Sequence, residues 1–166
     1  MAYQSLDEIA EYGKKHEEPF WRAVMLDDVN ERTVTEQESV ESMREMWKAM
    51  LSASEEYDET LISNSGLVGG MGGKMEEYRK KGNTLSGDFT ARVIAHALQM
   101  GESNACMKRI VAAPTAGACG VLPAVLVPLY QDGKVTEEQI VESLYVAAGI
   151  GQVIAARAFI AGAAGG

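Results

Sequence analysis

The sequence contains three copies of a local pattern that begins an amphipathic helix, and it almost lacks the alternating pattern of a β-strand. In this pattern, the capping box, a hydroxyl residue is followed three positions later by Glu or Gln, and each side chain satisfies a backbone amide of the first helical turn. The three capping boxes are Ser5–Glu8, Thr35–Glu38 and Thr136–Gln139. The one candidate strand is the short run 109–112, and Pro114 soon follows it. The sequence therefore predicts an all-α fold.

The spacing of apolar residues predicts the helices and their core. After Thr35, apolar residues recur at steps of three and four, which predicts a helix of roughly 20 residues with one apolar stripe. Further helices are expected after Pro19, over 74–81, from Asp88 to Gly101, over 121–130 and from Thr136 to Ala164. We expect one helical domain over residues 1–166. Its predicted core includes Val93, Ile94, Leu98, Leu122, Val125, Leu144 and Ile150.

Composition and charge limit the possible partners of this domain. Of the 166 residues, 46% are apolar and 23% are charged, as in an ordinary globular domain. The net charge of -9 repels phosphate backbones and anionic lipid headgroups, so nucleic acid is an unsuitable partner. Residues 1–18 are acidic and lack an apolar signal-peptide core, and no window reaches about eighteen uninterrupted apolar residues. We therefore expect a cytoplasmic protein that does not bind membranes.

Glycine is concentrated in the later part of the chain, where we expect any chemistry to lie. Gly13 is the only glycine among the first sixty residues, and sixteen glycines follow it. The glycine-rich segment 61–73 leads into a helix, so its backbone amides and Lys74 are suited to binding a carboxylate or a phosphate. Met75 follows Lys74, which does not fit the P-loop nucleotide fingerprint. The alternative interpretation of this segment is a flexible connector.

The two cysteines, Cys106 and Cys119, are expected to be free thiols because two cysteines without a metal-site spacing make no disulfide framework. Cys119 lies in a glycine-containing turn that opens an apolar helix. Amide dipoles in such a turn lower the pKa of a thiol, which suits a nucleophile or a soft-metal ligand. The alternative is that Cys119 is a small buried hydrophobe. His96 and His16 are interpreted as structural or surface residues.

Two segments together resemble a known family. Residues 104–126 resemble the signature of the iron–sulfur-dependent L-serine dehydratases, in particular the α chain of the two-chain form. Ser65–Gly70 and Gly73–Lys74 resemble the upstream glycine-rich segment of that family, and the resemblance extends from about residue 20 to the end of the chain. It implies a lyase of serine catabolism and gluconeogenesis that converts L-serine to pyruvate and ammonia. It also implies a β chain as partner, within a homo- or hetero-oligomer.

The resemblance further implies a cofactor and roles for particular residues. The family holds a [4Fe-4S] cluster with three cysteine thiolates, the first of which matches Cys119, and an iron of the cluster acts as a Lewis acid on the substrate hydroxyl. Ser65, Lys74 and the loop amides are candidates for binding the substrate carboxylate. Asn104 and Thr115 are candidates for binding the amino group or orienting the cluster. The general base is not assigned, because the family brings a histidine-bearing loop from its β chain or β domain.

The sequence departs from the family pattern near its end. The other two cluster cysteines of the family follow a glycine pair that resembles Gly165–Gly166, and Ala164 stands where a glutamate is usual. We therefore expect the amino-terminal portion of a longer catalytic domain. By itself this portion should be isolated without the cluster, release no pyruvate and self-associate. Two alternatives remain, a non-catalytic helical scaffold or interaction domain and an anion-binding module that uses the glycine-rich loop.

Overall fold

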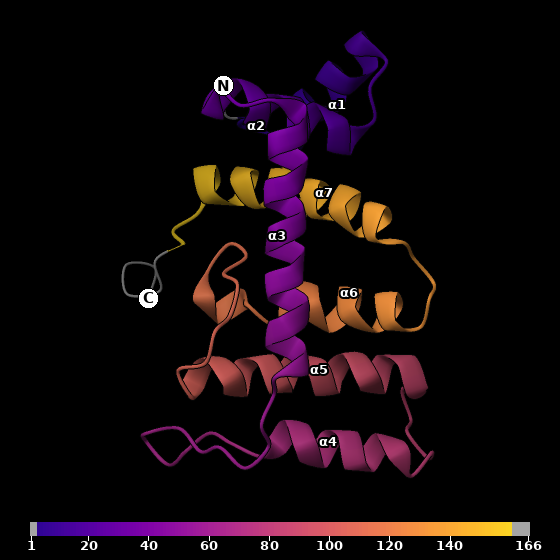
Figure 1. Ribbon diagram of the computed structural model, residues 1–166, viewed down its shortest axis with the longest axis vertical. Coiled ribbons are helices and arrows are strands. Elements are labelled where there is room, and N and C mark those ends of the chain that lie inside the picture. Colours follow the sequence, from indigo (N-terminus) through magenta and orange to yellow (C-terminus); the bar gives the residue numbers. More distant parts are fainter. Residues whose placement is uncertain (1–2, 161–166) are drawn as a thin grey trace. The chain divides into compact units, whose positions relative to one another are not determined.

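The computed structural model describes residues 3–160 and shows only helices and loops in that range (Figure 1). This confirms the predicted all-α fold. The helices are α1 (Leu6–His16), α2 (Phe20–Arg32), α3 (Glu36–Glu55), α4 (Met71–Lys80), α5 (Asp88–Ala105), the short 3-10 helix η1 (Ala116–Ala118), α6 (Val121–Gln131) and α7 (Glu137–Arg157).

The chain forms two compact units. Within the described residues, unit 1 combines 3–47 with 136–160, and unit 2 consists of residues 48–135. The long helix α3 contributes its first part to unit 1 and its last part to unit 2. The single helical domain stays a prediction, because two compact units that share a continuous helix can still unfold together.

All three predicted capping boxes begin helices, and two of them are reciprocal; at Ser5 the Glu8 carboxylate accepts from the Gln4 amide at 2.8 Å instead of the Ser5 amide. The Ser5 hydroxyl accepts a hydrogen bond from the amide of Glu8 at 3.2 Å, at the start of α1. At α3, the Thr35 hydroxyl accepts from the amide of Glu38 at 3.2 Å, and the Glu38 carboxylate accepts from the Thr35 amide at 2.8 Å. Thr136 forms the same reciprocal pair at α7. Each cap joins residues three positions apart, so local sequence is sufficient to specify it.

In unit 1, helices α1, α2 and α7 pack around a shared apolar core. Gly149 of α7 allows a close approach, because a Cβ at this position would lie only 2.6 Å from Val24 Cγ2 and 3.3 Å from Ile9 Cδ1. The buried residues of this core are Ile9, Ala23, Val24, Met25, Val141 and Tyr145. The small residue in α7 therefore serves close helix packing.

Helix α7 is shorter than predicted. It ends at Arg157 because Ala158 is in extended backbone (φ −131°, ψ 156°), and the predicted end at Ala164 lies outside the described residues. Among the described helices, α7 has the length and apolar composition to cross a membrane, a test that the core helix of a compact domain also passes. It buries Leu144 and Tyr145 within unit 1. The absence of a membrane partner stays a prediction.

In unit 2, helix α5 packs against both α4 and α6 (Figure 1). Two predicted bounds in these helices were wrong. Helix α4 begins at Met71, three residues before Lys74, because Gly70 provides a left-handed N-cap (φ 73°). Helix α5 continues through Gly101 to Ala105, and a Cβ at Gly101 would meet only open space. A glycine in an open helical position weakens a helix without ending it.

The predicted core was only partly correct. Leu144 is buried, and Val93 and Leu122 are half-buried. The other four predicted core residues are about 40% exposed, namely Ile94 (41%), Leu98 (39%), Val125 (40%) and Ile150 (40%). The buried faces of α5 and α6 carry the small residues Ala91, Ala95 and Ala124 together with the larger Met100 and Val127. Apolar spacing along one helix does not specify which part of its surface a neighbouring helix covers.

Candidate functional site at the carboxyl end of helix α5

The residues predicted to bind substrate or metal lie on three segments of unit 2. Ser65 and Lys74 lie in and just after the loop that precedes α4, Asn104 lies in the last turn of α5, and Thr115 and Cys119 flank η1. In Figure 1 the loop before α4 and the segment around η1 lie toward the same end of α5, its carboxyl end. Hydrogen bonds from the last turns of α5 connect this helix to both segments.

The first connection is made by Glu102, a buried residue of α5 that is 6% exposed. Its carboxylate accepts hydrogen bonds from the backbone amides of Met71 (2.6 Å) and Gly72 (3.1 Å). It also accepts one from the hydroxyl of Tyr57 (2.6 Å), whose oxygen in turn accepts from the amide of Gly73 (3.1 Å). The amides of Met71, Gly72 and Gly73 are therefore satisfied within the protein, and binding of a substrate carboxylate by the remaining loop amides stays a prediction.

Sequence reasoning did not single out Glu102. The residue follows Gly101, which was predicted to end the helix, so nothing in the local pattern indicated a buried carboxylate. The one available signal is the scarcity of acidic residues after residue 60, which makes each of them more informative than those in the acidic first part.

The glycines at the start of α4 are required for its close contact with neighbouring segments. A Cβ on Gly72 would lie 2.6 Å from Gln99 Cγ and 2.9 Å from the Gln99 backbone nitrogen. A Cβ on Gly73 would lie 2.5 Å from Glu59 Oε2 and 3.1 Å from Glu59 Cβ. Both glycines are buried. These glycines therefore belong to a closely packed helix start, which does not match the alternative of a flexible connector.

The loop before α4 is closed by hydrogen bonds of its own. The amide of Ser63 donates to the carbonyl of Val68 (2.8 Å), and the amide of Val68 donates to the Ser63 hydroxyl (3.1 Å). Ser63 is buried, and its hydroxyl oxygen lies 3.0 Å from that of the exposed Ser65. Lys74 is also exposed, and no partner of its ammonium is found within residues 3–160. Ser65 and Lys74 are therefore accessible to a ligand, and Ser63 is a structural residue that the sequence did not reveal.

The second connection is made by Asn104. Its side-chain amide donates to the carbonyl of Ala116 in η1 at 3.1 Å. The preceding Thr115 is the N-cap of η1, and its hydroxyl makes no capping hydrogen bond. Thr115 is half-buried. Asn104 thus fixes η1 against the end of α5. The Thr115 hydroxyl is not used to cap η1.

Cys119 is buried, with 1% of its surface exposed. Its Sγ is 3.7 Å from the carbonyl of Met100, to which the thiol donates a weak hydrogen bond. Burial raises the pKa of the Cys119 thiol above its ordinary value. The predicted lowering of this pKa was therefore wrong, because loss of solvation outweighs the backbone hydrogen bond at this turn. Cys106 is half-buried, and both cysteines are free thiols.

The donor groups near Cys119 do not by themselves fit an iron–sulfur cluster. Within residues 3–160, no three His, Cys, Asp or Glu side chains are grouped so that they could hold a metal ion. A cluster on cysteine thiolates needs several deprotonated sulfurs that face one space. Cys119 provides a single protonated and enclosed thiol in this arrangement.

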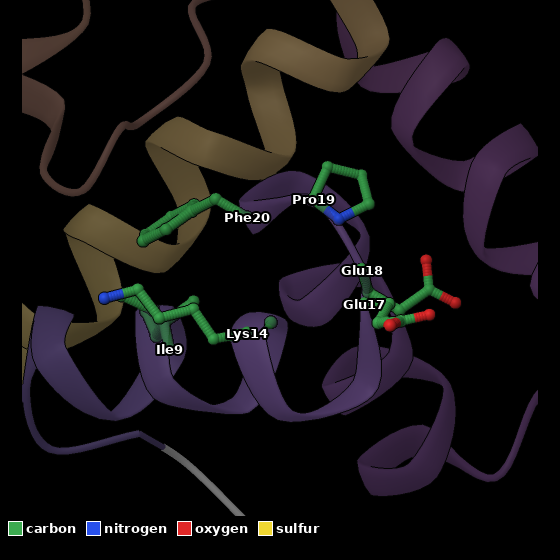
Figure 2. A pocket seen from close by; sticks show the side chains of 8 residues that line it. Ile9, Lys14, Glu17, Glu18, Pro19 and Phe20 are labelled. Atoms are coloured by element: carbon green, nitrogen blue, oxygen red, sulfur yellow. The ribbon is translucent and has the colours of Figure 1, made fainter.

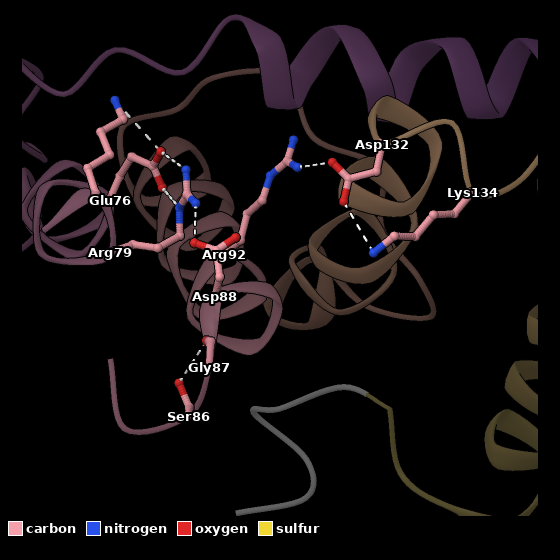
Figure 3. A network of polar contacts seen from close by, with 9 residues as sticks. Glu76, Arg79, Ser86, Gly87, Asp88, Arg92, Asp132 and Lys134 are labelled. Carbon is pink, nitrogen blue, oxygen red and sulfur yellow. Dashed lines mark hydrogen bonds and ion pairs between the residues drawn. The ribbon is translucent and has the colours of Figure 1, made fainter. Parts of the chain in front are cut away.

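The opposite, amino end of α5 is held by ion pairs (Figure 3). Arg79 of α4 bonds to Glu76 in its own helix and to Asp88 at the start of α5. Arg92 of α5 pairs with Asp132 at the end of α6. The shortest distances are 2.8 Å for Arg79–Glu76, 2.6 Å for Arg79–Asp88 and 2.5 Å for Arg92–Asp132. These contacts join α4, α5 and α6 at the end away from Glu102.

The histidines have structural partners, in agreement with the sequence interpretation. His96 is half-buried, and its Nδ1 lies 3.0 Å from the hydroxyl oxygen of Ser54. Burial lowers the pKa of His96, and the positive charge of Arg92 lowers it further. In unit 1, His16 stacks on Tyr12 and its Nδ1 lies 2.9 Å from the Tyr12 carbonyl oxygen.

A cavity in unit 1 contains none of the predicted site residues. It lies between α1 and the start of α2 and is an open depression of about 470 Å³ (Figure 2). Ile9 and Phe20 form part of its apolar wall, and Lys14, Glu17 and Glu18 contribute charged groups. The cavity in unit 1 is therefore not part of the candidate site in unit 2.

Comparison with known proteins assigns the chain to a family. Residues 8–166 match the family model described as "Serine dehydratase alpha chain". The chain belongs to the serine dehydratase alpha chain family. The match includes both segments that α5 brings together, so the site described above lies in the part that the family shares. No solved structure matches the chain.

Individual members of the serine dehydratase alpha chain family are moderately similar to this chain. The probable L-serine dehydratase alpha chain of Bacillus subtilis is 34% identical over 151 residues, which cover 87% of this chain and 50% of that protein. The L-serine dehydratase alpha chain of Peptoniphilus asaccharolyticus is 33% identical over 144 residues, which cover 86% of this chain and 49% of that protein. The chain thus spans about half the length of these relatives.

Proposed function

We propose that this chain is part of an iron–sulfur-dependent L-serine dehydratase and that unit 2 provides its serine-binding end. The main support is the connection of two family-like segments through α5. Glu102 fixes the start of α4 near Ser65 and Lys74, and Asn104 fixes η1 near Thr115. Membership in the serine dehydratase alpha chain family and the names of the relatives support serine as the substrate.

In this proposal, exposed side chains bind the carboxylate of serine. The ammonium of Lys74 supplies a positive charge, and the hydroxyl of Ser65 supplies a hydrogen-bond donor. Asn104 uses one amide hydrogen on Ala116 and keeps its side-chain oxygen as an acceptor for the substrate amino group. The half-buried Thr115 is the second candidate for that contact.

The reaction removes a proton from Cα and hydroxide from Cβ of serine. The aminoacrylate that results tautomerises to an imine, which water hydrolyses to pyruvate and ammonia. The proton acceptor is not assigned to a residue of this chain, because His96 is engaged with Ser54 in a half-buried position. The family resemblance points instead to a histidine-bearing loop of a β chain or β domain, and a separate β chain agrees with the printed name "alpha chain" of two relatives.

Cys119 is proposed to be one thiolate ligand of the iron–sulfur cluster in the assembled enzyme. Because the thiol is protonated and enclosed, ligation requires loss of the proton and an opening around Sγ. The remaining ligands must come from residues outside the part of the chain that the structure describes. The proposed enzyme acts in the cytoplasm and contains α and β chains in a homo- or hetero-oligomer.

The experiment that tests this function is a pyruvate assay. A chain extended by the family segment that carries the two later cysteines is combined with a β chain from the family and reconstituted anaerobically with iron and sulfide, and pyruvate release from L-serine is measured. We expect release that depends on iron. Iron uptake without any release from L-serine would contradict the proposed activity. The same assay with the 166-residue chain and the β chain tests the expected inactivity of this chain, which contains only Cys106 and Cys119.

A further inference from the structure

Glu102 is not among the residues proposed to bind the carboxylate of serine, and its buried position needs a separate explanation. It is an acidic side chain with 6% exposure, and burying a carboxylate is costly unless hydrogen bonds replace its water. Three donors do so, the amides of Met71 and Gly72 and the hydroxyl of Tyr57. Two of these donors belong to the first turn of α4, where the helix dipole also favours a negative charge.

These contacts fix the direction in which α4 leaves its loop. The Tyr57 hydroxyl accepts from the amide of Gly73, so Glu102 and Tyr57 together hold three consecutive amides of α4. Lys74 is the next residue. Burial and the hydrogen bond to Glu102 raise the pKa of the Tyr57 hydroxyl, so it keeps its proton and donates at neutral pH.

We propose that Glu102 is a positioning residue for the substrate carboxylate site. Its own carboxylate occupies the amides of the first turn of α4, and it thereby holds Lys74 and the Ser65 loop in the geometry that binds serine. This inference rests on the proposed function. It predicts that Glu102 affects the binding of serine more than the chemical step, because the contact is present in the ground state and the transition state alike.

Chemical rescue in the assembled enzyme tests the role of Glu102. In Glu102→Ala we expect the KM for L-serine to rise about tenfold with a smaller change in kcat, since a hydrogen-bonded charge has been lost. Added formate should lower this KM again, because a small carboxylate can occupy the vacated position at the amides of Met71 and Gly72. Glu77→Gln, a change of an exposed carboxylate on α4, is the matched control and should leave KM and its formate response as in the wild type.

A second measurement covers the possibility that Glu102→Ala does not fold. In the chain itself, hydrogen exchange of the amides of Met71, Gly72 and Gly73 should be faster in Glu102→Gln than in the wild type or Glu77→Gln. An unchanged KM in Glu102→Ala, or a raised KM that formate does not lower, would overturn the proposal. Unchanged exchange in Glu102→Gln would also overturn it. If the wild-type enzyme does not deaminate serine, the proposed function fails, while the exchange experiment still tests the contact between Glu102 and α4.

Discussion

At the scale of single residues, the site depends on which polar groups are already engaged inside the protein. The amides that begin α4 are bound by Glu102 and Tyr57, so a ligand cannot use them without displacing an internal partner. Lys74 and Ser65 are exposed, whereas Cys119 is enclosed. In the proposed function, the residues that face solvent bind the substrate, and the Cys119 thiol would have to become accessible to bind iron.

Lys74→Met should weaken serine binding in the assembled enzyme. Loss of the ammonium removes a charge-assisted hydrogen bond to the carboxylate, and we expect a rise of roughly 10- to 100-fold in KM. Steady-state kinetics with L-serine checks this expectation. Lys81→Met, an exposed lysine at the end of the same helix, is the control, and equal effects of the two substitutions would contradict a specific role for Lys74.

Cys119 should react with iodoacetamide more slowly than Cys106 in the folded chain. The thiolate is the reactive species, and burial both shields Cys119 and raises its pKa. Mass spectrometry of peptides after timed alkylation measures both rates. In denaturant the two cysteines should react at similar rates. Faster alkylation of Cys119 than of Cys106 under native conditions would show that the thiol is not enclosed.

At the scale of elements, unit 2 is held together by the packing of α4 and α6 against α5. The amino end of α5 is joined to its neighbours by ion pairs of Arg79 and Arg92, and the carboxyl end by Glu102 and Asn104. Ion pairs that keep contact with solvent contribute little to stability, so close packing and the buried hydrogen bonds of Glu102 carry more of the stability of this unit. Gly72 is a position where α4 comes close to the backbone of α5, since a Cβ there would lie 2.9 Å from the Gln99 nitrogen.

Two glycine substitutions should therefore have opposite effects. Gly72→Ala should lower the free energy of unfolding by about 2 kcal/mol, because its Cβ would overlap Gln99. Gly101→Ala should raise the free energy of unfolding by up to about 1 kcal/mol, since its Cβ meets open space inside a helix. Urea unfolding of the two variants and the wild type measures both changes. A loss of stability in Gly101→Ala would show that its surroundings are not open.

At the scale of the whole molecule, the two compact units differ in what they contribute. Unit 1 consists of α1, α2, α7 and the first part of α3, and it contains the cavity near Phe20. Unit 2 contains all the residues predicted to bind substrate or metal. It also contains the half-buried His96, whose titration links the stability of the fold to pH.

The folded chain should lose stability as the pH falls below about 6.5, the ordinary pKa of histidine. Burial lowers the pKa of His96 in the folded state, so at mildly acidic pH the unfolded chain binds more protons and is favoured. This loss grows down to the folded pKa, whereas carboxylates with lowered pKa values, such as Glu76 and Asp132, contribute only at more acidic pH. Thermal unfolding from pH 7 to pH 5 tests this, with His96→Gln expected to show a smaller decrease. Equal pH dependence in both proteins would exclude His96 as the cause.

The sequence by itself determined the features that depend on near neighbours. Capping boxes at Ser5, Thr35 and Thr136 join residues three positions apart, and apolar spacing of three and four predicts an all-α fold without long-range information. The motif around Cys119 was also sufficient to indicate the family, which the family model confirms.

Only the tertiary structure decided which groups are buried and which are engaged. Glu102 meets Met71 across thirty-one positions of sequence, a separation that no local spacing encodes. The pKa of Cys119 is raised because neighbouring segments remove its solvent, whereas the turn by itself suggested the opposite direction. Ile94 and Leu98 are partly exposed because the neighbouring helices cover a different face of α5, the one with Ala91, Ala95 and Met100. Burial and long-range hydrogen bonds depend on how helices pack, and a pattern of residue types along one helix does not specify its neighbours.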